Sequence, residues 1–205
     1  DPLAQSFAAR MQNKGYEAAG LNLIYFYTVA GNEHLGDIVN GLRYMPFAGF
    51  AVTKPNKVKV LEYLDELDPL CAKMGSSNTV VKLPDGRLKG YNTDGTGFYK
   101  ALEEAGVSVS GRTFFCFGSG GAGRAICSAL ADHGAGRILI TDILEESARS
   151  LTADINGKFA PVAEFVPYGD FSQVKDAGAV INASGVGMGK TIGQTPLPPE
   201  YIRPG

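Results

Sequence analysis

The chain has 205 residues, of which 44% are hydrophobic and 20% are charged, and its net charge is −2. This length suffices for one or two domains with a substantial core, and the balanced charge argues against nucleic-acid binding. No apolar run approaches the roughly 20 residues that a membrane span needs, and no signal peptide is evident. The three cysteines are scattered without metal-ligand spacing, so we expect a cytoplasmic protein without a metal site.

Both ends of the sequence suggest a piece of a longer chain. It begins at Asp1 without a methionine, and it stops at "PPEYIRPG", directly after a predicted loop. We therefore expect that the chain is truncated at both ends.

The stretch "GFAVTKPNKVKVLEYLDEL", residues 49–67, predicts a helix that begins at Pro55, because proline suits a first helical position. Lys57 would head the apolar face of this helix, whereas Lys59 would lie on the solvated side. The apolar face would be formed by Val60, Leu61, Leu64 and Leu67. Lys57 is thus the candidate for chemistry, although the pattern equally suits a lysine whose stem covers apolar surface.

A hairpin and a helix are predicted next. Strands at 79–83 and 87–91 are joined by the turn "PDG", and a helix runs from about Gly97 to Ala105. Asp94 would stand just before this helix, where capping its N-terminus is the common structural role of an aspartate.

A dinucleotide-binding turn is predicted in "RTFFCFGSGGAGRAICSALADHGAGRILITD", residues 112–142. A buried strand at 113–117 and a helix at 122–133 flank a G-x-G-x-x-G motif, and a second strand follows at 138–141. Such glycines permit a tight turn and close approach to a pyrophosphate at the helix N-terminus. The expected cofactor contacts are Gly118, Ser119, Gly120, Gly121, Ala122, Gly123 and, roughly 20 residues on, Asp142. A purely structural turn is the alternative.

A second binding loop is predicted in "AGAVINASGVGMG", residues 177–189. It reads as a buried strand that ends near Ala183, followed by a glycine-rich loop. Ligands of open α/β sheets lie beyond the carboxyl ends of the strands, so we expect the loop to border the nicotinamide through Asn182, Ala183, Ser184 and Met188. A mobile connection without a ligand contact is the alternative.

Five motifs, in order and at matching spacing, resemble the shikimate/quinate dehydrogenase family: "GFAVTKPNK", "GSSNTVV", "GYNTDGTGF", "GSGGAG" and "INASGVGM". The resemblance implies an α/β fold with an N-terminal substrate-binding domain, residues 1–96. A Rossmann-like, doubly wound dinucleotide-binding domain would follow at residues 97–205, incomplete at its C-terminus. It also implies an NAD(P)-dependent oxidoreductase acting on shikimate, quinate or a related small cyclic hydroxy acid, as a monomer or homodimer.

The resemblance also implies roles for particular residues. Lys57 and Asp94 would form the catalytic pair, in which a base takes the hydroxyl proton as hydride leaves for the nicotinamide. Thr53, Asn78 and Thr93 would hydrogen-bond the hydroxyl groups of the substrate.

The opening segment "PLAQSFAARMQN" departs from the family pattern. Ser6 matches the first of two family serines that bind the substrate carboxylate, but the second falls on Ala8. Gln5 and Gln12 stand where the family usually has histidine. A missing hydroxyl at a carboxylate site should weaken or redirect substrate recognition.

The cofactor half departs as well. Many members of the family follow the second strand of this domain with a basic turn that grips the 2′-phosphate of NADP, whereas this chain reads "ILITDILEESAR". Asp142 could accept two hydrogen bonds from a free ribose diol and would repel a 2′-phosphate. We therefore expect NAD to be preferred over NADP by roughly a hundredfold. Asp142 could equally cap the following helix.

A non-catalytic ligand- or nucleotide-sensing module is the alternative from another functional class. Its expected mark would be a broken catalytic pair. Because Lys57 and Asp94 are both present, the sequence favours the enzyme.

Overall fold

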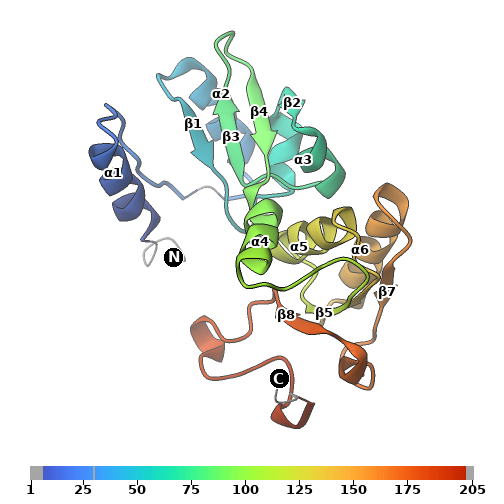
Figure 1. The fold of residues 1–205 in the computed structure, drawn as a ribbon. Helices are drawn as coiled ribbons and strands as arrows, with labels where there is room; N and C mark the ends of the chain where they lie inside the picture. The colour runs from blue at the N-terminus through green and yellow to red at the C-terminus, as the bar shows by residue number, and fades with distance from the viewer. Residues whose placement is uncertain (1–6, 30, 202–205) are drawn as a thin grey trace.

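The computed structural model describes residues 7–29 and 31–201, which form two β-sheets joined by a helix (Figure 1). The first sheet has the order β1-β3-β4-β2, with antiparallel pairs except for the parallel pair β2–β4. Its strands are β1 (Gly49–Ala51), β2 (Glu66–Leu67), β3 (Thr79–Lys82) and β4 (Leu88–Tyr91). Helices α2 (Leu35–Tyr44) and α3 (Pro69–Met74) accompany this sheet. Its core contains Leu35, Val39, Val52, Val60, Val80 and Leu88.

The second sheet is parallel throughout, with the order β7-β6-β5-β8. Its strands are β5 (Thr113–Phe117), β6 (Arg137–Thr141), β7 (Ala163–Phe165) and β8 (Ala179–Asn182). Parallel strands need crossover connections, and here α5 (Gly121–Asp132) and α6 (Glu145–Lys158) supply them. The predicted α/β class and Rossmann-like second half are confirmed.

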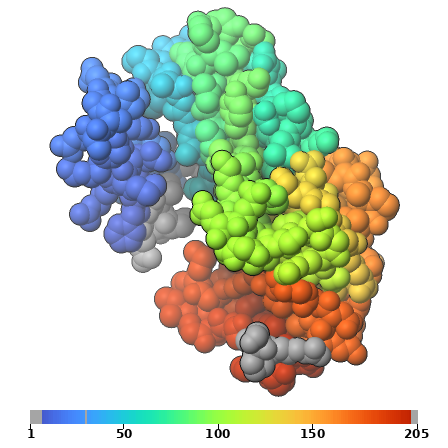
Figure 2. Space-filling model, viewed as in Figure 1, coloured from blue at the N-terminus to red at the C-terminus, as the bar shows by residue number. Residues whose placement is uncertain are grey.

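Helix α4 (Thr93–Glu104) connects the two sheets and packs along α5 (Figure 1). Figure 2 shows α4, in yellow-green, on the surface between the two sheets. Gly95 permits this packing, because a Cβ added there would lie 2.7 Å from the carbonyl oxygen of Ala125 and 2.6 Å from Cε of Met74. The expected domain boundary, between residues 96 and 97, falls inside α4. We propose that this helix is the junction of the two domains.

The predicted helix beginning at Pro55 is wrong. A short 3₁₀ turn at Lys59–Tyr63 takes its place, and Leu67 belongs to strand β2. The reason lies in a contact distant in sequence: the backbone carbonyl of Lys57 accepts from Ser77 N at 2.7 Å, so it does not continue an α-helical ladder.

The predicted start of α4 is also corrected. The helix begins at Thr93 rather than near Gly97, because Asn92 caps it by accepting a hydrogen bond from Asp94 N at 3.0 Å. Asp94 therefore lies in the first turn and is not itself the cap.

The N-terminal segment has little cover among the described residues. Helix α1 (Ala8–Ala18) has no buried residue, and the extended segment after it exposes Leu23, Ile24 and Phe26 by 50%, 79% and 56%. Within the described residues, no helix has the length and apolar character that crossing a membrane would require.

We predict that Gly95→Ala lowers the free energy of unfolding by about 1–3 kcal/mol, because its methyl group would be forced into α5 and Met74. Gly97→Ala in the same helix is the matched control. No atom lies within 4 Å of its added Cβ, so better helix propensity should stabilise the protein by about 1 kcal/mol. Urea unfolding measures both, and equal effects would contradict the packing explanation.

Candidate functional site

The centre of the candidate site is an ion pair between Lys57 and Asp94. Lys57 Nζ lies 2.5 Å from Asp94 Oδ2, and the two side chains are 18% and 31% exposed. The pair is thus partly sheltered, yet it keeps access to a ligand. An amine and a carboxylate at this distance can exchange and hold a proton, which general acid–base chemistry requires.

Lys57 is held from two sides. Its carbonyl accepts from the N–H of buried Ser77, which fixes the backbone. Its aliphatic stem lies against Gly121, the first residue of α5, since a Cβ added there would be 3.2 Å from Lys57 Cδ and 3.5 Å from Lys57 Cβ. Lys57, from the turn after β1, therefore rests on the start of the predicted dinucleotide helix.

Asp94 is held by its helix and by a neighbouring amide. Asn92, 6% exposed, is itself fixed because its Nδ2 donates to the backbone oxygen and to Oγ of Ser76. Asp94 Oδ1 accepts from Asn78 Nδ2 at 2.8 Å, which leaves Oδ2 facing Lys57. Each carboxylate oxygen thus has a defined partner.

Asn78, an expected substrate contact, makes several hydrogen bonds within the protein. Its Oδ1 accepts from Thr93 N, a group that can only donate, so its Nδ2 must face Asp94. The two Nδ2 protons go to Asp94 Oδ1 and Thr93 Oγ1. Both donors of Asn78 therefore have partners within the protein, and one of them helps to orient Asp94. The contact of Asn78 with a substrate stays a prediction.

Thr79 is a residue of this network that the sequence reasoning missed. Its hydroxyl donates to Asn78 Oδ1 at 2.9 Å and so helps to fix the amide. It belongs to the motif "GSSNTVV", but its role depends on where strand β3 places it beside Asn78.

Two predicted substrate-binding threonines lie close to the pair in the chain. Thr53 and Thr93 are both exposed, Thr53 on the segment that leads to Lys57 and Thr93 as the first residue of α4. The Thr93 hydroxyl is hydrogen-bonded to the Asn78 amide, and the contacts of both threonines with a substrate stay predictions. Ser6, the predicted carboxylate contact, lies outside the described residues.

The glycine motif forms the predicted strand–turn–helix. Gly118 has φ +101°, a conformation that favours glycine, and a Cβ there would lie 2.7 Å from Ser184 N. Gly123 packs directly on the carbonyl of Gly118. At Gly120, by contrast, an added Cβ meets no atom within 4 Å, and Ala122 is exposed. The turn is therefore tight on its inner side and open on its outer side, as a pyrophosphate cradle requires.

Ser119 and Asp142 bind each other inside this turn. Asp142 Oδ2 accepts from the N–H and the hydroxyl of Ser119 at 2.7 and 2.8 Å, and its Oδ1 accepts from Leu144 N at 3.0 Å. Asp142 thus ties the glycine turn to the start of α6. The Ser119 side chain, 4% exposed, points into the protein.

The predicted nicotinamide loop follows β8 and lies against the glycine turn. Ala183 and Ser184 approach Gly118, as its missing side chain permits. Asn182 shapes the loop by accepting from Ser184 and donating to the carbonyl of Val186 at 3.0 Å. Met188 is 72% exposed. The structure thus brings three of the four predicted loop residues, Asn182, Ala183 and Ser184, to the carboxyl edge of the sheet.

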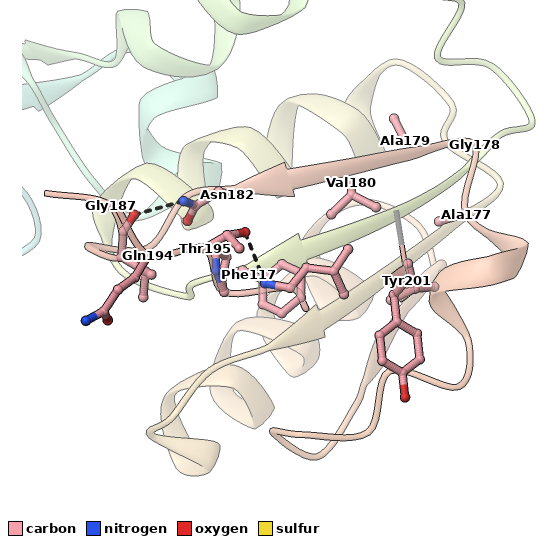
Figure 3. Close-up of a pocket in the computed structure, with 14 residues that line it drawn as sticks. Phe117, Ala177, Gly178, Ala179, Val180, Asn182, Gly187, Gln194, Thr195 and Tyr201 are labelled. Atoms are coloured by element: carbon pink, nitrogen blue, oxygen red, sulfur yellow. Dashed lines mark hydrogen bonds between the residues drawn. The ribbon is translucent and has the colours of Figure 1, made fainter. Parts of the chain in front are cut away.

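A cavity of about 640 Å³ lies between β8 and the C-terminal segment 194–197 (Figure 3). Its lining includes Phe117, Val180, Asn182, Gly187 and Tyr201. Neither Lys57 nor Asp94 lines it. The cavity therefore touches the predicted nicotinamide loop at one end but is separate from the ion pair.

Other chemistries find no support in the described part of the chain. All three cysteines are buried free thiols, and burial raises the pKa of the Cys71 thiol to about 11, which disfavours the nucleophilic thiolate. Among residues 7–29 and 31–201, no group of three or more His, Cys, Asp or Glu side chains is placed to hold a metal ion.

Comparisons with known proteins identify the family of this chain. A family profile described as "Shikimate dehydrogenase substrate binding domain" matches residues 1–80. The shikimate dehydrogenase (NADP(+)) of Moorella thermoacetica is 38% identical over 100% of this chain and 70% of its own length. The crystal structure of Listeria monocytogenes shikimate 5-dehydrogenase with shikimate and NAD has a TM-score of 0.90 at 35% identity, covering 99% of this chain and 73% of that one. That of the Thermus thermophilus enzyme with NADP(H) and shikimate has a TM-score of 0.84 at 30% identity, covering 98% and 72%.

The expected preference for NAD over NADP is wrong. The Moorella relative is named for NADP(+), and the Thermus structure contains NADP(H). The expectation depended on a free Asp142 carboxylate that would accept two bonds from a ribose diol. In the structure three protein donors already occupy that carboxylate, out of roughly four lone-pair positions, so it cannot accept both.

The alternative of a non-catalytic sensing module has no support from these comparisons, because the relatives are dehydrogenases. A relative of 38% identity aligns along the whole chain, and the fold matches that of the solved enzymes. This chain therefore belongs to the shikimate/quinate dehydrogenase family of NAD(P)-dependent oxidoreductases that act on a hydroxyl group.

Proposed function

We propose that the chain catalyses reversible oxidation of a ring hydroxyl of shikimate, quinate or a related cyclic hydroxy acid to the ketone, with NADP as the cofactor. The observation that carries the proposal is the position of Lys57. Its Nζ meets Asp94 at 2.5 Å, and its stem lies against the first residue of the dinucleotide helix. This position beside the glycine turn supports an acid–base role for Lys57.

The residues present fit a dinucleotide. The outer side of the glycine turn is open at Gly120, and the N–H groups at the start of α5 can bind its phosphates. When bound, the nicotinamide ring supplies or accepts the hydride. The carboxyl edge formed by Asn182, Ala183 and Ser184 would border it.

Lys57 performs the proton transfer in this proposal. In the oxidation direction Lys57 acts as the neutral amine: as the substrate carbon loses hydride, Nζ takes the hydroxyl proton and becomes the ammonium. In the reverse direction the ammonium gives that proton to the carbonyl oxygen and returns to the amine. Asp94 holds Nζ in place and compensates its charge. Thr53 and Thr93 would hydrogen-bond neighbouring hydroxyl groups, while Asn78 keeps Asp94 oriented.

The first prediction of this proposal concerns Lys57. Lys57→Ala should lower kcat for shikimate oxidation by at least ~10²-fold, the low end for a general acid–base residue, with little change in cofactor affinity. Absorbance of the reduced nicotinamide follows turnover, and comparing NADP with NAD in the same assay tests the proposed cofactor. Lys59→Ala is the control, because Lys59 Nζ binds the carbonyl of Asn32 instead and its removal should leave kcat within about twofold of the wild-type value.

The second prediction separates two roles for Asn78. Asn78→Ala removes a hydrogen bond to the Asp94 carboxylate, an interaction of about 1.5–3 kcal/mol. We expect kcat to fall roughly tenfold or more, while KM for shikimate stays within about threefold. A raised KM with unchanged kcat would show instead that Asn78 binds the substrate.

The third prediction concerns the departure at Ala8. Restoring the family residue with Ala8→Ser should raise kcat/KM for shikimate about tenfold, because a hydrogen bond to a carboxylate is regained. Steady-state kinetics with shikimate and quinate measure the effect. An unchanged or lower value for shikimate would argue that this site selects another hydroxy acid.

A further inference from the structure

We infer that Gly121 is a positioning residue for the acid–base step: because it lacks a Cβ, the stem of Lys57 can lie against α5 with its Nζ on Asp94. The inference rests on the proposed function of Lys57. It gives Gly121 a role separate from the phosphate binding expected of the glycine turn.

The glycine at position 121 is not explained by its backbone. Gly118 needs its positive φ and Gly123 needs its close contact with the carbonyl of Gly118. Gly121 has no positive φ and is the first residue of a helix, where other residues are accepted. The three nearest atoms to its added Cβ all belong to Lys57, namely Cδ at 3.2 Å, Cβ at 3.5 Å and Cγ at 3.8 Å.

The same face of α5 also receives Gly95, the residue after Asp94. Gly121 and Ala125 are one helical turn apart and so lie on one face. Lys57 rests at Gly121, while Gly95, the residue after Asp94, packs on the carbonyl of Ala125. Both members of the ion pair are therefore positioned from one helix face, and a shift of the lysine stem by a few tenths of an ångström changes its approach to Asp94 directly.

The kinetic test is Gly121→Ala in the full chain. We expect kcat to fall at least fivefold, while KM for NADP stays within about threefold. At Gly120 an added Cβ meets no protein atom but faces the expected phosphates. Gly120→Ala should therefore raise KM for NADP and leave kcat nearly unchanged. Gly157→Ala in α6, also with open space around its added Cβ, is the control and should leave both constants unchanged.

A double variant separates positioning from damage to the turn. If Gly121 acts through Lys57, adding Gly121→Ala to Lys57→Ala should not lower the residual kcat further, and the melting temperature should not fall below that of Lys57→Ala alone. An additional loss of kcat or stability in the Lys57→Ala background would overturn the inference, as would a single variant with wild-type kcat.

A measurement independent of turnover keeps this test apart from that of the proposed function. Acetylation of lysines by acetic anhydride, mapped by mass spectrometry, reports how well each amine is held. Gly121→Ala should speed acetylation of Lys57 at least threefold and leave Lys59 unchanged. Unchanged labelling of Lys57 would refute the positioning role, whether or not the wild-type protein oxidises shikimate.

Discussion

The close packing of α4 against α5 is the constraint that sets the geometry of the site. Helix α4 carries Asp94 in its first turn, and α5 begins at the glycine turn that is expected to bind the dinucleotide. Gly95 brings the two helices so near that no other side chain fits between its Cα and the carbonyl of Ala125. Because packed interiors do not deform continuously, this contact fixes the distance between the acid–base pair and the cofactor turn.

A chain of hydrogen bonds then fixes the orientation of the Asp94 carboxylate. Ser76 holds Asn92, Asn92 caps α4 at Asp94, and Asn78 takes the carboxylate oxygen that Lys57 does not use. Networks of this kind, with each donor and acceptor matched, specify one arrangement, whereas a partly satisfied network would be costly. The arrangement leaves the Lys57 side chain partly exposed beside Asp94.

A hydrogen-bonded carboxylate also stabilises the glycine turn of the second sheet. Asp142 connects the glycine turn to α6 through Ser119 and Leu144, so this carboxylate at the end of the second strand stabilises the turn. Carboxylate position in the chain is therefore a weaker guide to cofactor choice than the hydrogen bonds that the carboxylate has already made. Membership of a family with NADP-named relatives is consistent with this interpretation.

Features with local or periodic causes could be predicted from the sequence alone. Strand β5, the glycine turn and helix α5 followed from an apolar run, a glycine pattern and a helical repeat, and the motifs identified the family and the pair Lys57 and Asp94. How that pair is held depends instead on tertiary contacts. The carbonyl of Lys57 is taken by Ser77, so the expected helix does not form there, and the cap at Asn92 depends on Ser76 across the chain. Likewise Asn78 and Asp142 form hydrogen bonds with partners that only folding brings to them. Hydrogen bonds between residues distant in sequence leave no periodic signal, and so they had to be found in the fold.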